Sequence, residues 1–405
     1  MTDKAIGKWP HFDKDEILAV QKVLESGKVN YWTGEECRNF EKEFALYLNR
    51  KRAISVFNGT VALELALYAF GIGPGDEVIV TCRTFIASAA CIILRGAIPV
   101  FADIDPESQN IRVDSISEKI TPRTKAIICV HLAGWPCDMD PIMKLAKKHN
   151  LIVIEDCAQA HGAAYKGKPV GSWGDAATFS FCQDKIITTG GEGGMLVTDD
   201  EEIYRKCWSY KDHGKPVESL ANKEADFPSK SPYVSFGTNM RMTEMQAAIG
   251  RIQLKKLDKW VQIRRNNAER FNKEFACLKA LRLTIPPKEF YHSYYKYYFF
   301  VKPEELNSGW SRDRIMQQIS SAGIPCLSGG YIELYLEKAF LDYFENARKT
   351  GAKHISIHEP LQRFPVAQRL SETSLMLQVH PTLTEETLQK TIDVVKKVMT
   401  EATRV

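Results

Sequence analysis

The sequence has no long uninterrupted apolar run and no block of basic residues. Its most apolar stretches, such as CIILRGAIPVF at 91–101, are short and broken by charge, so we expect no membrane-spanning helix. A formal net charge of +4 over 405 residues gives no reason to expect a nucleic-acid partner. The N-terminal segment MTDKAIGKWPHFDKDE lacks the basic start and apolar core of a signal peptide. With 44% hydrophobic and 26% charged residues, the composition predicts a soluble, cytoplasmic, globular protein.

Closely spaced cysteines are absent as well. The ten cysteines are scattered singly, no CxxC pair occurs, and several lie in apolar runs such as KAIICVHL. This pattern favours buried free thiols in a reducing compartment over a disulfide framework or a zinc site. The one close histidine pair, His354 and His358, has helical spacing but no third ligand nearby, so we expect a partly exposed helix face there. We predict no metal site.

The sequence does contain a regular alternation of apolar strands and helices up to about residue 200. Periodicity predicts strands at 52–57, 76–81, 98–104, 125–132 and 151–156, and helices at 13–26, 34–48, 87–96 and 139–150. Strands that are apolar throughout and alternate with helices indicate a parallel sheet that helices cover on both faces.

The pattern changes after residue 200. The polar stretch 215–237 has little periodicity, so we expect a long loop, and loops of that length are usually functional. Further elements are expected at 242–276 (a long helix), 294–303 (an aromatic strand), 311–322 (a helix) and after HPTLTEE (a terminal helix). We predict a large domain of residues 1–255 and a smaller α+β domain of residues 256–405.

Ligands of parallel sheets bind at the carboxyl ends of the strands, and two such ends carry notable residues. Asn58-Gly59-Thr60 joins a strand to a helix, where glycine lets the backbone approach an anion and Thr60 adds a hydroxyl. Taken alone, a plain helix N-cap explains this tripeptide better. Asp156 ends the strand LIVIED and, with Gln159, could receive a protonated ring nitrogen and a neighbouring oxygen. A helix N-cap is an equal alternative for Asp156.

A third strand end lies in TFSFCQDKIITTGGEGG, residues 178–194, where Ser180 precedes a single lysine, Lys185. A lysine at the end of a buried strand is costly to charge, which favours a nucleophilic amine that can form a Schiff base with pyridoxal phosphate (PLP). For this segment alone, a surface lysine in a hairpin turn is the better alternative. The phosphate cradle, the acid and the lysine, in this order, together match a PLP site. Phe85 is available to stack on the ring.

Over nearly its whole length the sequence resembles the DegT/StrS-type sugar aminotransferases, which are PLP enzymes of the aspartate aminotransferase fold. The blocks that carry the resemblance are FNGTVALELAL, GIGPGDEVIV, TPRTKAI, IEDCAQAHGAAYKGKPVGSWGDAATFSF, the lysine followed by TTGGEGGM, and TNMRMTEMQAAIGRIQL. The resemblance implies PLP fold type I, an α/β fold. Its large domain has a mostly parallel seven-stranded sheet flanked by helices, and a smaller C-terminal α+β domain follows.

The resemblance also implies roles for individual residues. Lys185 forms the Schiff base with the cofactor and Asp156 partners its pyridine nitrogen. Gln159 contacts the phenolic oxygen, and Phe85 stacks on the ring.

The cofactor phosphate has its own implied contacts. Gly59, Thr60 and Ser180 hold it from one subunit, and Asn239 reaches it from the other. This implies a homodimer with active sites at the interface, and it gives the 215–237 loop a reason to cross between subunits.

Two segments depart from the family pattern. Residues 182–184 precede the lysine as Cys-Gln-Asp, and residues 325–340 replace a segment that contains His and Tyr in many members. Both could contact substrate, so Asp184 is a candidate substrate residue. Arg241 is another, because its charge could hold a diphosphate.

The activity implied is amination of a nucleotide-linked keto-deoxysugar by L-glutamate, with a 4-keto sugar favoured over a 3-keto sugar. The product would serve surface polysaccharide synthesis, such as the O-antigen of lipopolysaccharide, or a related glycan. A cyclitol aminotransferase of aminoglycoside biosynthesis and a non-catalytic PLP-binding regulator are the alternatives. A PLP-dependent sugar dehydratase is disfavoured, because those enzymes replace the lysine with histidine and this chain keeps Lys185.

Overall fold

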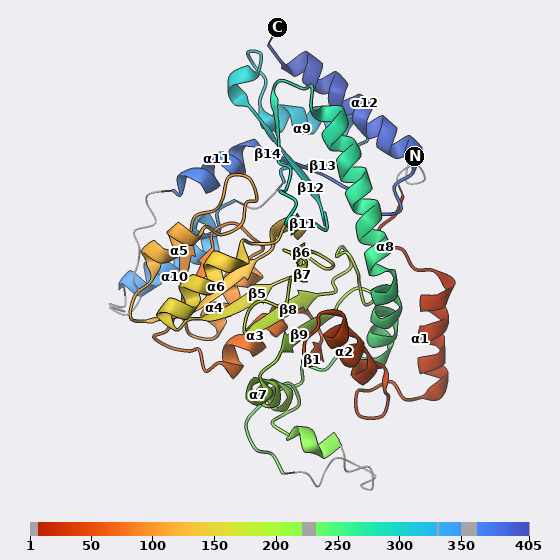
Figure 1. Ribbon diagram of the computed structural model, residues 1–405, viewed down its shortest axis with the longest axis vertical. Helices are drawn as coiled ribbons and strands as arrows, with labels where there is room; N and C mark the ends of the chain where they lie inside the picture. The colour runs from red at the N-terminus through yellow and green to blue at the C-terminus, as the bar shows by residue number, and fades with distance from the viewer. Residues whose placement is uncertain (1–6, 221–231, 330–331, 350–362, 405) are drawn as a thin grey trace.

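The computed structural model describes residues 7–220, 232–329, 332–349 and 363–404 (Figure 1). Its centre is a seven-stranded sheet of order β1-β9-β8-β5-β4-β2-β3. Neighbouring strands are parallel except where β9 pairs with β1 and β8. The strands are β1 (Arg52–Val56), β2 (Glu77–Thr81), β3 (Ile98–Ala102), β4 (Thr124–Val130), β5 (Ile152–Asp156), β8 (Ala176–Ser180) and β9 (Gly194–Thr198). The predicted mostly parallel sheet and its first five strands are confirmed.

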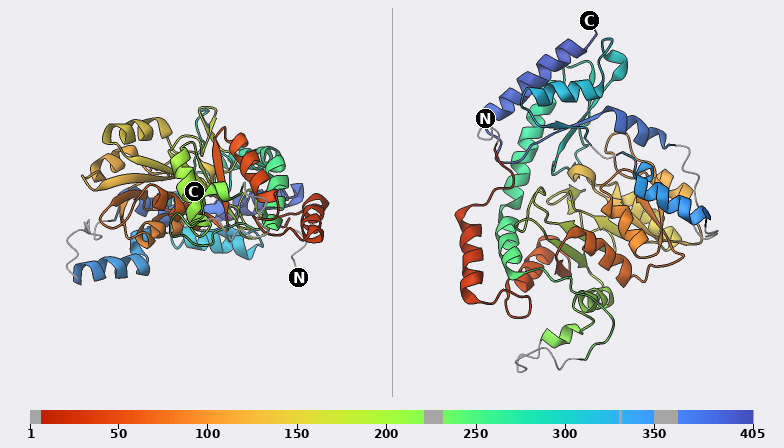
Figure 2. Two further views of the ribbon diagram at one scale, coloured as in Figure 1. Left: turned by 90° about the horizontal axis from the view of Figure 1, so that it is seen from below. Right: turned by 180° about the vertical axis from the view of Figure 1, so that it is seen from behind.

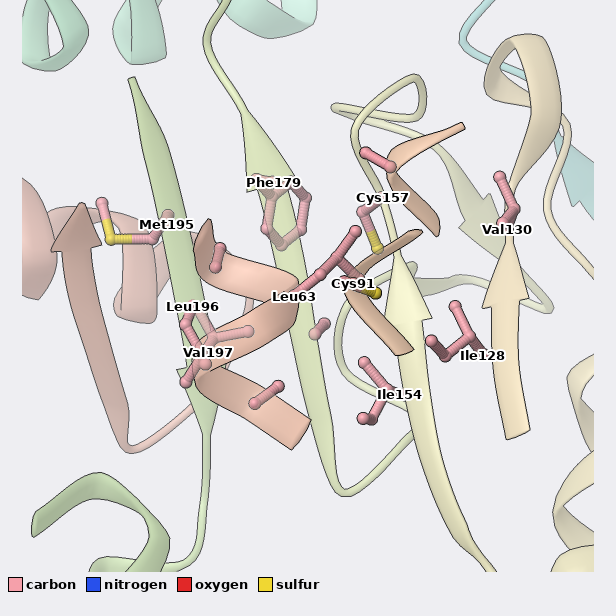
Figure 3. Close-up of a cluster of buried hydrophobic side chains, with 14 of the residues drawn as sticks. Leu63, Cys91, Ile128, Val130, Ile154, Cys157, Phe179, Met195, Leu196 and Val197 are labelled. Atoms are coloured by element: carbon pink, nitrogen blue, oxygen red, sulfur yellow. The ribbon is translucent and has the colours of Figure 1, made fainter. Parts of the chain in front are cut away.

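Helices cover both faces of this sheet, and β4 shows why its sequence is apolar throughout. Ile128 and Val130 belong to one core cluster, whereas Ile127 and Cys129 belong to another on the opposite face. Successive side chains of a strand point to opposite faces, so both sets need cover. Figure 3 shows the first cluster, in which Leu63 lies among side chains of β5, β8 and β9. The covering helices are α3 (Gly59–Ala69) and α4 (Ala87–Leu94) on that face and α5 (Val113–Lys119) and α6 (Met139–His149) on the other.

A 32-residue helix, α8 (Glu244–Phe275), joins the sheet to the C-terminal part of the chain. It packs at its start against α1 (Lys14–Ser26) and α2 (Glu36–Tyr47), and near its end Phe271 and Phe275 enter a separate core cluster. α7 (Glu201–Lys211) lies beside β1 and α3. The predicted domain boundary at residue 255 falls inside α8, and the division of the chain into two domains stays a prediction.

The C-terminal part is built on an antiparallel sheet of order β10-β12-β14-β13. Its strands are β10 (Leu281–Leu283), β12 (Tyr297–Val301), β13 (Cys326–Leu327) and β14 (Ser374–Leu377), and its helices are α9 (Arg312–Ser321), α10 (Lys338–Lys349), α11 (Pro365–Thr373) and α12 (Glu385–Ala402). A third small sheet has the order β11-β6-β7, formed by Phe290–Tyr291, Ala164–Tyr165 and Lys168–Pro169. The aromatic strand and the helices α9 and α12 were predicted. The two- to four-residue strands were not, because so short a run carries no periodic signal.

The N-terminal segment returns to the C-terminal part of the chain, as two opposite views show (Figure 1; Figure 2, right). The Thr382 hydroxyl donates a 2.9 Å hydrogen bond to the Lys8 carbonyl, and the rings of Trp9 and His380 stack 6.0 Å apart. This contact holds Trp9 beside the loop that carries Lys185.

Two sequence-based expectations concern residues that the structure does not describe. The His354 and His358 pair lies outside the described residues, as does the 221–231 part of the expected 215–237 loop. Within the described ranges, no helix is both long and apolar enough to cross a membrane.

Candidate active site

Four of the parallel strands end at one edge of the sheet, and each delivers a predicted site residue there. Asn58 follows β1, Phe85 follows β2, Asp156 ends β5 and Ser180 ends β8. Because these strands all run in the same direction, their carboxyl ends meet at the same edge. The chain therefore gathers there residues that are up to 122 positions apart in sequence.

Gly59 and Ser180 lie against each other at the start of α3. The Asn58 side chain caps this helix by accepting a 3.0 Å hydrogen bond from the Val61 N–H, so the N-cap explanation is correct in itself. A Cβ on Gly59 would lie 2.7 Å from the Ser180 Cβ, which is too close for two carbon atoms that are not bonded to each other. Thr60 is partly exposed in the first turn. The N–H groups of this first turn, next to the Ser180 hydroxyl, would stabilise an anion.

Asp156 is almost fully buried at the end of β5. Its Oδ2 accepts a 2.8 Å hydrogen bond from the Ser88 hydroxyl, and its Oδ1 accepts a 3.1 Å bond from the Ala158 N–H. Burial raises the pKa of Asp156, while these two hydrogen bonds and the charge of Lys185 act in the opposite direction. A cationic N–H placed beside this carboxylate would restore its ionised form.

Gln159 joins this edge to the C-terminal part of the chain. Its Oε1 accepts a 2.9 Å hydrogen bond from the Ala133 N–H, and the Ala133 carbonyl accepts a 2.8 Å bond from the Tyr295 N–H. Gly134, at φ 96°, allows this approach, because a Cβ there would lie 2.5 Å from the Ser293 Oγ. The segment between β11 and β12, far along the sequence, is thereby fixed against the site.

Lys185 follows β8 and points toward Tyr295. Its Nζ lies 3.5 Å from the Tyr295 hydroxyl and 3.8 Å from Asp184 Oδ1, and the same hydroxyl donates a hydrogen bond to Asp184. The Lys185 carbonyl accepts a 2.9 Å hydrogen bond from Trp9 Nε1. The side chain of Lys185 is only 16% exposed, so a surface turn does not describe it. Trp9 thus holds the backbone of the lysine, and Tyr295 contacts its side chain.

Phe85 begins the turn before α4, three residues ahead of Ser88. Half of its surface is exposed, which is unusual for a large aromatic residue at the foot of a buried strand. The Thr84 and Ser88 hydroxyls lie 3.2 Å apart and link this turn to Asp156. A planar ring lying over Phe85 would cover its exposed face.

Asn239 and Arg241 lie beside the chain that enters the Asn58 turn. The Met240 carbonyl accepts a 3.1 Å hydrogen bond from the Phe57 N–H, and the Asn239 side chain is exposed. Arg241 donates a 2.8 Å hydrogen bond from Nη1 to the buried Asp212. Its charge therefore has a partner within the chain, and the binding of a diphosphate by Arg241 stays a prediction.

Several residues near Lys185 were missed by reasoning from sequence. His161 is buried between Phe179 and Phe181, with ring centroids 5.5 and 5.6 Å away, and burial together with the Lys185 charge lowers its pKa to about 3. The others are Ser88, Trp9, Arg264, Tyr295 and Lys296. Their distance along the chain gives no spacing signal, and YYKYYFF has the pattern of a packed strand.

One buried group within the described residues has metal-ligand chemistry, formed by His131, Glu155 and Cys157. Glu155 accepts hydrogen bonds from His131 Nε2 and from three backbone N–H groups, those of Gly171, Trp173 and Gly174. These bonds explain the buried carboxylate as a structural support for the loop after β5.

A model of the DegT/DnrJ/EryC1/StrS aminotransferase family matches residues 10–396. The chain belongs to this family. GDP-perosamine synthase of Caulobacter vibrioides is 44% identical over 317 residues, which are 78% of this chain and 81% of that protein. UDP-N-acetyl-3-dehydro-alpha-D-glucosamine 3-aminotransferase of Acidithiobacillus ferrooxidans is 36% identical over a match that covers 95% of this chain and 94% of that protein. An aminotransferase structure from Psychrobacter cryohalolentis has a TM-score of 0.90 and 51% identity, covering 98% of this chain and 99% of the other.

The protein is thus a PLP-dependent sugar aminotransferase, and the residues at this edge fit the cofactor. Gly59 lies so close to Ser180 that a Cβ would not fit between them. This contact is at the start of a helix, where backbone N–H groups favour a phosphate. The buried carboxylate of Asp156 suits a protonated ring nitrogen, and Lys185 supplies an amine at the same edge.

Proposed function

We propose that this protein transfers the amino group of L-glutamate to the keto carbon of a nucleotide-linked deoxysugar, giving an amino sugar for a surface polysaccharide or a related glycan. The observation that supports this most strongly is the meeting of Lys185, Asp156 and the Gly59–Ser180 cradle at one sheet edge, in a chain of this family.

Each residue has a role in this proposal. PLP, when bound, supplies an aldehyde that takes up the amino group and a ring that accepts electrons from the carbon losing its proton. Lys185 carries that proton away from the Cα of the donor and later returns a proton at the sugar carbon. Asp156 keeps the ring nitrogen protonated, and Gln159 donates to the phenolic oxygen through its amide nitrogen. Gly59, Thr60 and Ser180 hold the phosphate, and Phe85 stacks on the ring.

The position of the keto group is the finer part of the proposal. We favour a keto group at C4, and the relative named as a perosamine synthase, at 44% identity, supports this choice. The 36% identical relative named as a 3-aminotransferase supports the C3 alternative. Since the names of these two relatives begin with different nucleotides, the nucleotide is left open.

We also propose a homodimer with shared active sites. Asn239 is exposed, unlike Asp156, Ser180 and Gly59, which is the expected state of a residue that serves the neighbouring subunit. Large apolar side chains near it in sequence are exposed too, with Phe236 at 97% and Tyr233 and Val234 above 60%. A cluster of exposed apolar residues of this kind is typical of an interface.

The proposal is tested with a panel of ketones presented to the pyridoxamine form of the enzyme. The panel holds GDP-, UDP- and dTDP-linked 4-keto and 3-keto sugars, with a free inosose as the cyclitol alternative, and mass spectrometry detects the amino product. We expect amination of a nucleotide-linked 4-keto sugar. Amination of the inosose alone would favour the cyclitol aminotransferase hypothesis. No amination of any ketone would favour the hypothesis of a non-catalytic PLP-binding regulator. Lys185→Ala is the control and should reduce turnover by at least about 1000-fold.

A further inference from the structure

Three cationic side chains lie around Tyr295, and they share one carboxylate. The Nζ atoms of Lys185 and Lys296 lie 4.8 and 4.7 Å from the centre of the Tyr295 ring. Arg264 donates a 3.3 Å hydrogen bond from Nη1 to the Tyr295 carbonyl. Asp184, which accepts from the Tyr295 hydroxyl, is the carboxylate that acts electrostatically on all three cations. The group therefore has more positive than negative charge.

Two of these cations have no counter-ion of their own. Within the described residues, Lys296 Nζ makes no hydrogen bond or ion pair, and it lies over the Tyr295 ring. Arg264 is 2% exposed, and its Nε and Nη2 have no hydrogen-bond partner in the described part of the chain. Burial lowers the pKa of Lys296 to about 8 and that of Arg264 to about 9. Burying cations without anions is costly, so a ligand that brings a negative charge would be bound strongly here.

The chemistry of transamination identifies which anion belongs at this place. In an α-amino acid, the carbon that bears the reacting nitrogen also carries a carboxylate, so the anchor of that carboxylate must lie a few ångströms from Lys185 Nζ. In a sugar with its keto group at C4, the diphosphate is attached at C1, across the ring from the reacting carbon. A cation that contacts the same tyrosine ring as Lys185 therefore suits the amino acid better than the nucleotide sugar.

We propose that Lys296 binds the α-carboxylate of the amino donor, with Arg264 as a positioning residue that adds positive potential behind it. The inference rests on the proposed function, since it assumes an amino-acid donor. Lys296 is partly exposed and can contact the substrate, whereas Arg264 is enclosed beneath Trp9, whose ring centre is 4.8 Å from the guanidinium carbon.

The same arrangement explains how one site can take two substrates in turn. The keto sugar presents hydroxyls where the amino acid presents a carboxylate, so the site must tolerate the loss of that negative charge. Asp184 offsets part of the positive charge when the donor has left, and a lysine on a flexible stem can still donate a weaker hydrogen bond to a hydroxyl.

The test measures the first half-reaction alone, with holoenzyme and L-glutamate, by stopped-flow absorbance of the cofactor. Lys296→Met should raise the apparent Kd for glutamate about 10- to 100-fold, the loss expected for a charge-assisted hydrogen bond. Lys296→Arg should recover most of this affinity. Lys288→Met, which removes an exposed lysine eight residues earlier in the sequence, is the matched control and should behave as wild type.

A change in the ligand separates lost carboxylate binding from general damage. L-alanine and ethylamine differ only by the carboxylate. Lys296→Met should therefore weaken the binding of L-alanine strongly and the binding of ethylamine by less than about 3-fold. The half-reaction of the pyridoxamine form with the keto sugar should also change less than about 3-fold. An unchanged Kd for glutamate and alanine, an equal loss with ethylamine, a larger loss with the sugar or loss of PLP would each overturn the proposal. Failure of every sugar in the ketone panel would overturn the proposed function instead, because the donor half-reaction needs no sugar.

Discussion

The Ser88 hydroxyl lies 2.8 Å from Asp156 Oδ2 and donates a hydrogen bond to it. Asp156 is buried, and burial raises its pKa, so each donor aimed at this carboxylate helps to keep it ionised. Ser88 comes from the first turn of α4 and Asp156 from the end of β5, 68 residues later. The contact couples the turn that carries Phe85 to the acid that is expected to face the cofactor nitrogen.

Ser88→Ala should therefore lower kcat by about 10-fold, because a hydrogen bond to a charged group contributes about 1.5–3 kcal/mol and only part of it acts on the ring nitrogen. Steady-state kinetics at saturating PLP would measure the loss. In an Asp156→Asn background the same serine change should cost little more, since the charge that Ser88 stabilises is gone. Equal losses in both backgrounds would show that Ser88 acts independently of Asp156.

Asp156→Asn should stabilise the cofactor-free protein at neutral pH while abolishing most of its activity. Since the folded state raises the pKa of Asp156, it holds the proton more tightly than the unfolded chain does, and stability falls as pH rises from about 4 through the raised pKa. The asparagine variant lacks this loss, so at pH 7 its apoprotein should be more stable than the wild-type apoprotein. Thermal melting between pH 4 and pH 8, with and without PLP, checks this. If Asp156→Asn remained more stable than the wild type by the same amount after PLP was added, the pairing of Asp156 with the ring nitrogen would be contradicted.

Most of the sheet could be predicted from sequence because its strands are buried along their length and mostly apolar. β2, β3, β8 and β9 are buried at every position, and their sequences EVIVT, IPVFA, AATFS and GMLVT are mostly apolar. The same regularity placed Gly59, Asp156 and Ser180 at strand ends, where parallel strands must bring them together. The small sheet formed by β11, β6 and β7 has no such regularity, since each of its strands has two residues.

Gly59→Ala should weaken PLP binding by about 10- to 100-fold, because the added methyl would lie 2.7 Å from the Ser180 Cβ and push the phosphate cradle open. A fluorescence titration of apoprotein with PLP measures the change. Gly73→Ala is the control, since a Cβ there would meet its nearest atom, the Arg95 carbonyl oxygen, at 3.8 Å. Wild-type affinity in Gly59→Ala would mean that the phosphate lies elsewhere.

The exposed position of Asn239 leads to a complementation experiment. If Asn239 serves the neighbouring subunit, then Lys185→Ala and Asn239→Asp chains, each inactive alone, should form mixed dimers with one intact site. A statistical mixture should recover about a quarter of wild-type activity, since half of the dimers are mixed and half of their sites are intact. Recovery should fail when both substitutions are on one chain and it is mixed with Lys185→Ala. If Asn239 served its own subunit, the first mixture would be inactive.

The residues around Tyr295 could not have been found from sequence, and the reason is physical. Tyr295 is fixed through its backbone, whose N–H donates to the Ala133 carbonyl, and any residue type could make that bond. Arg264 lies on α8 where the helix passes the site, among many other charged residues of that helix. Their meeting depends on the packing of the C-terminal part against the sheet, which no local pattern encodes.

Donor binding should weaken as pH rises, since Lys296 has its pKa lowered to about 8 and loses its charge near there. The groups acting on it are Asp184, Arg264 and Lys185, and only Asp184 favours the charged form. The apparent Kd for glutamate in the first half-reaction should therefore rise above about pH 8 in the wild type. In Lys296→Arg the rise should move to higher pH, because a guanidinium stays protonated.

Arg264→Gln gives the decisive version of this measurement. Removing the Arg264 charge relieves repulsion on Lys296, so the pH at which glutamate binding weakens should move upward. Loss of structure at this buried position would lower affinity at every pH without moving the midpoint upward. A midpoint that stayed in place, with folding confirmed by unchanged PLP absorbance, would mean that Arg264 does not act on Lys296 through its charge.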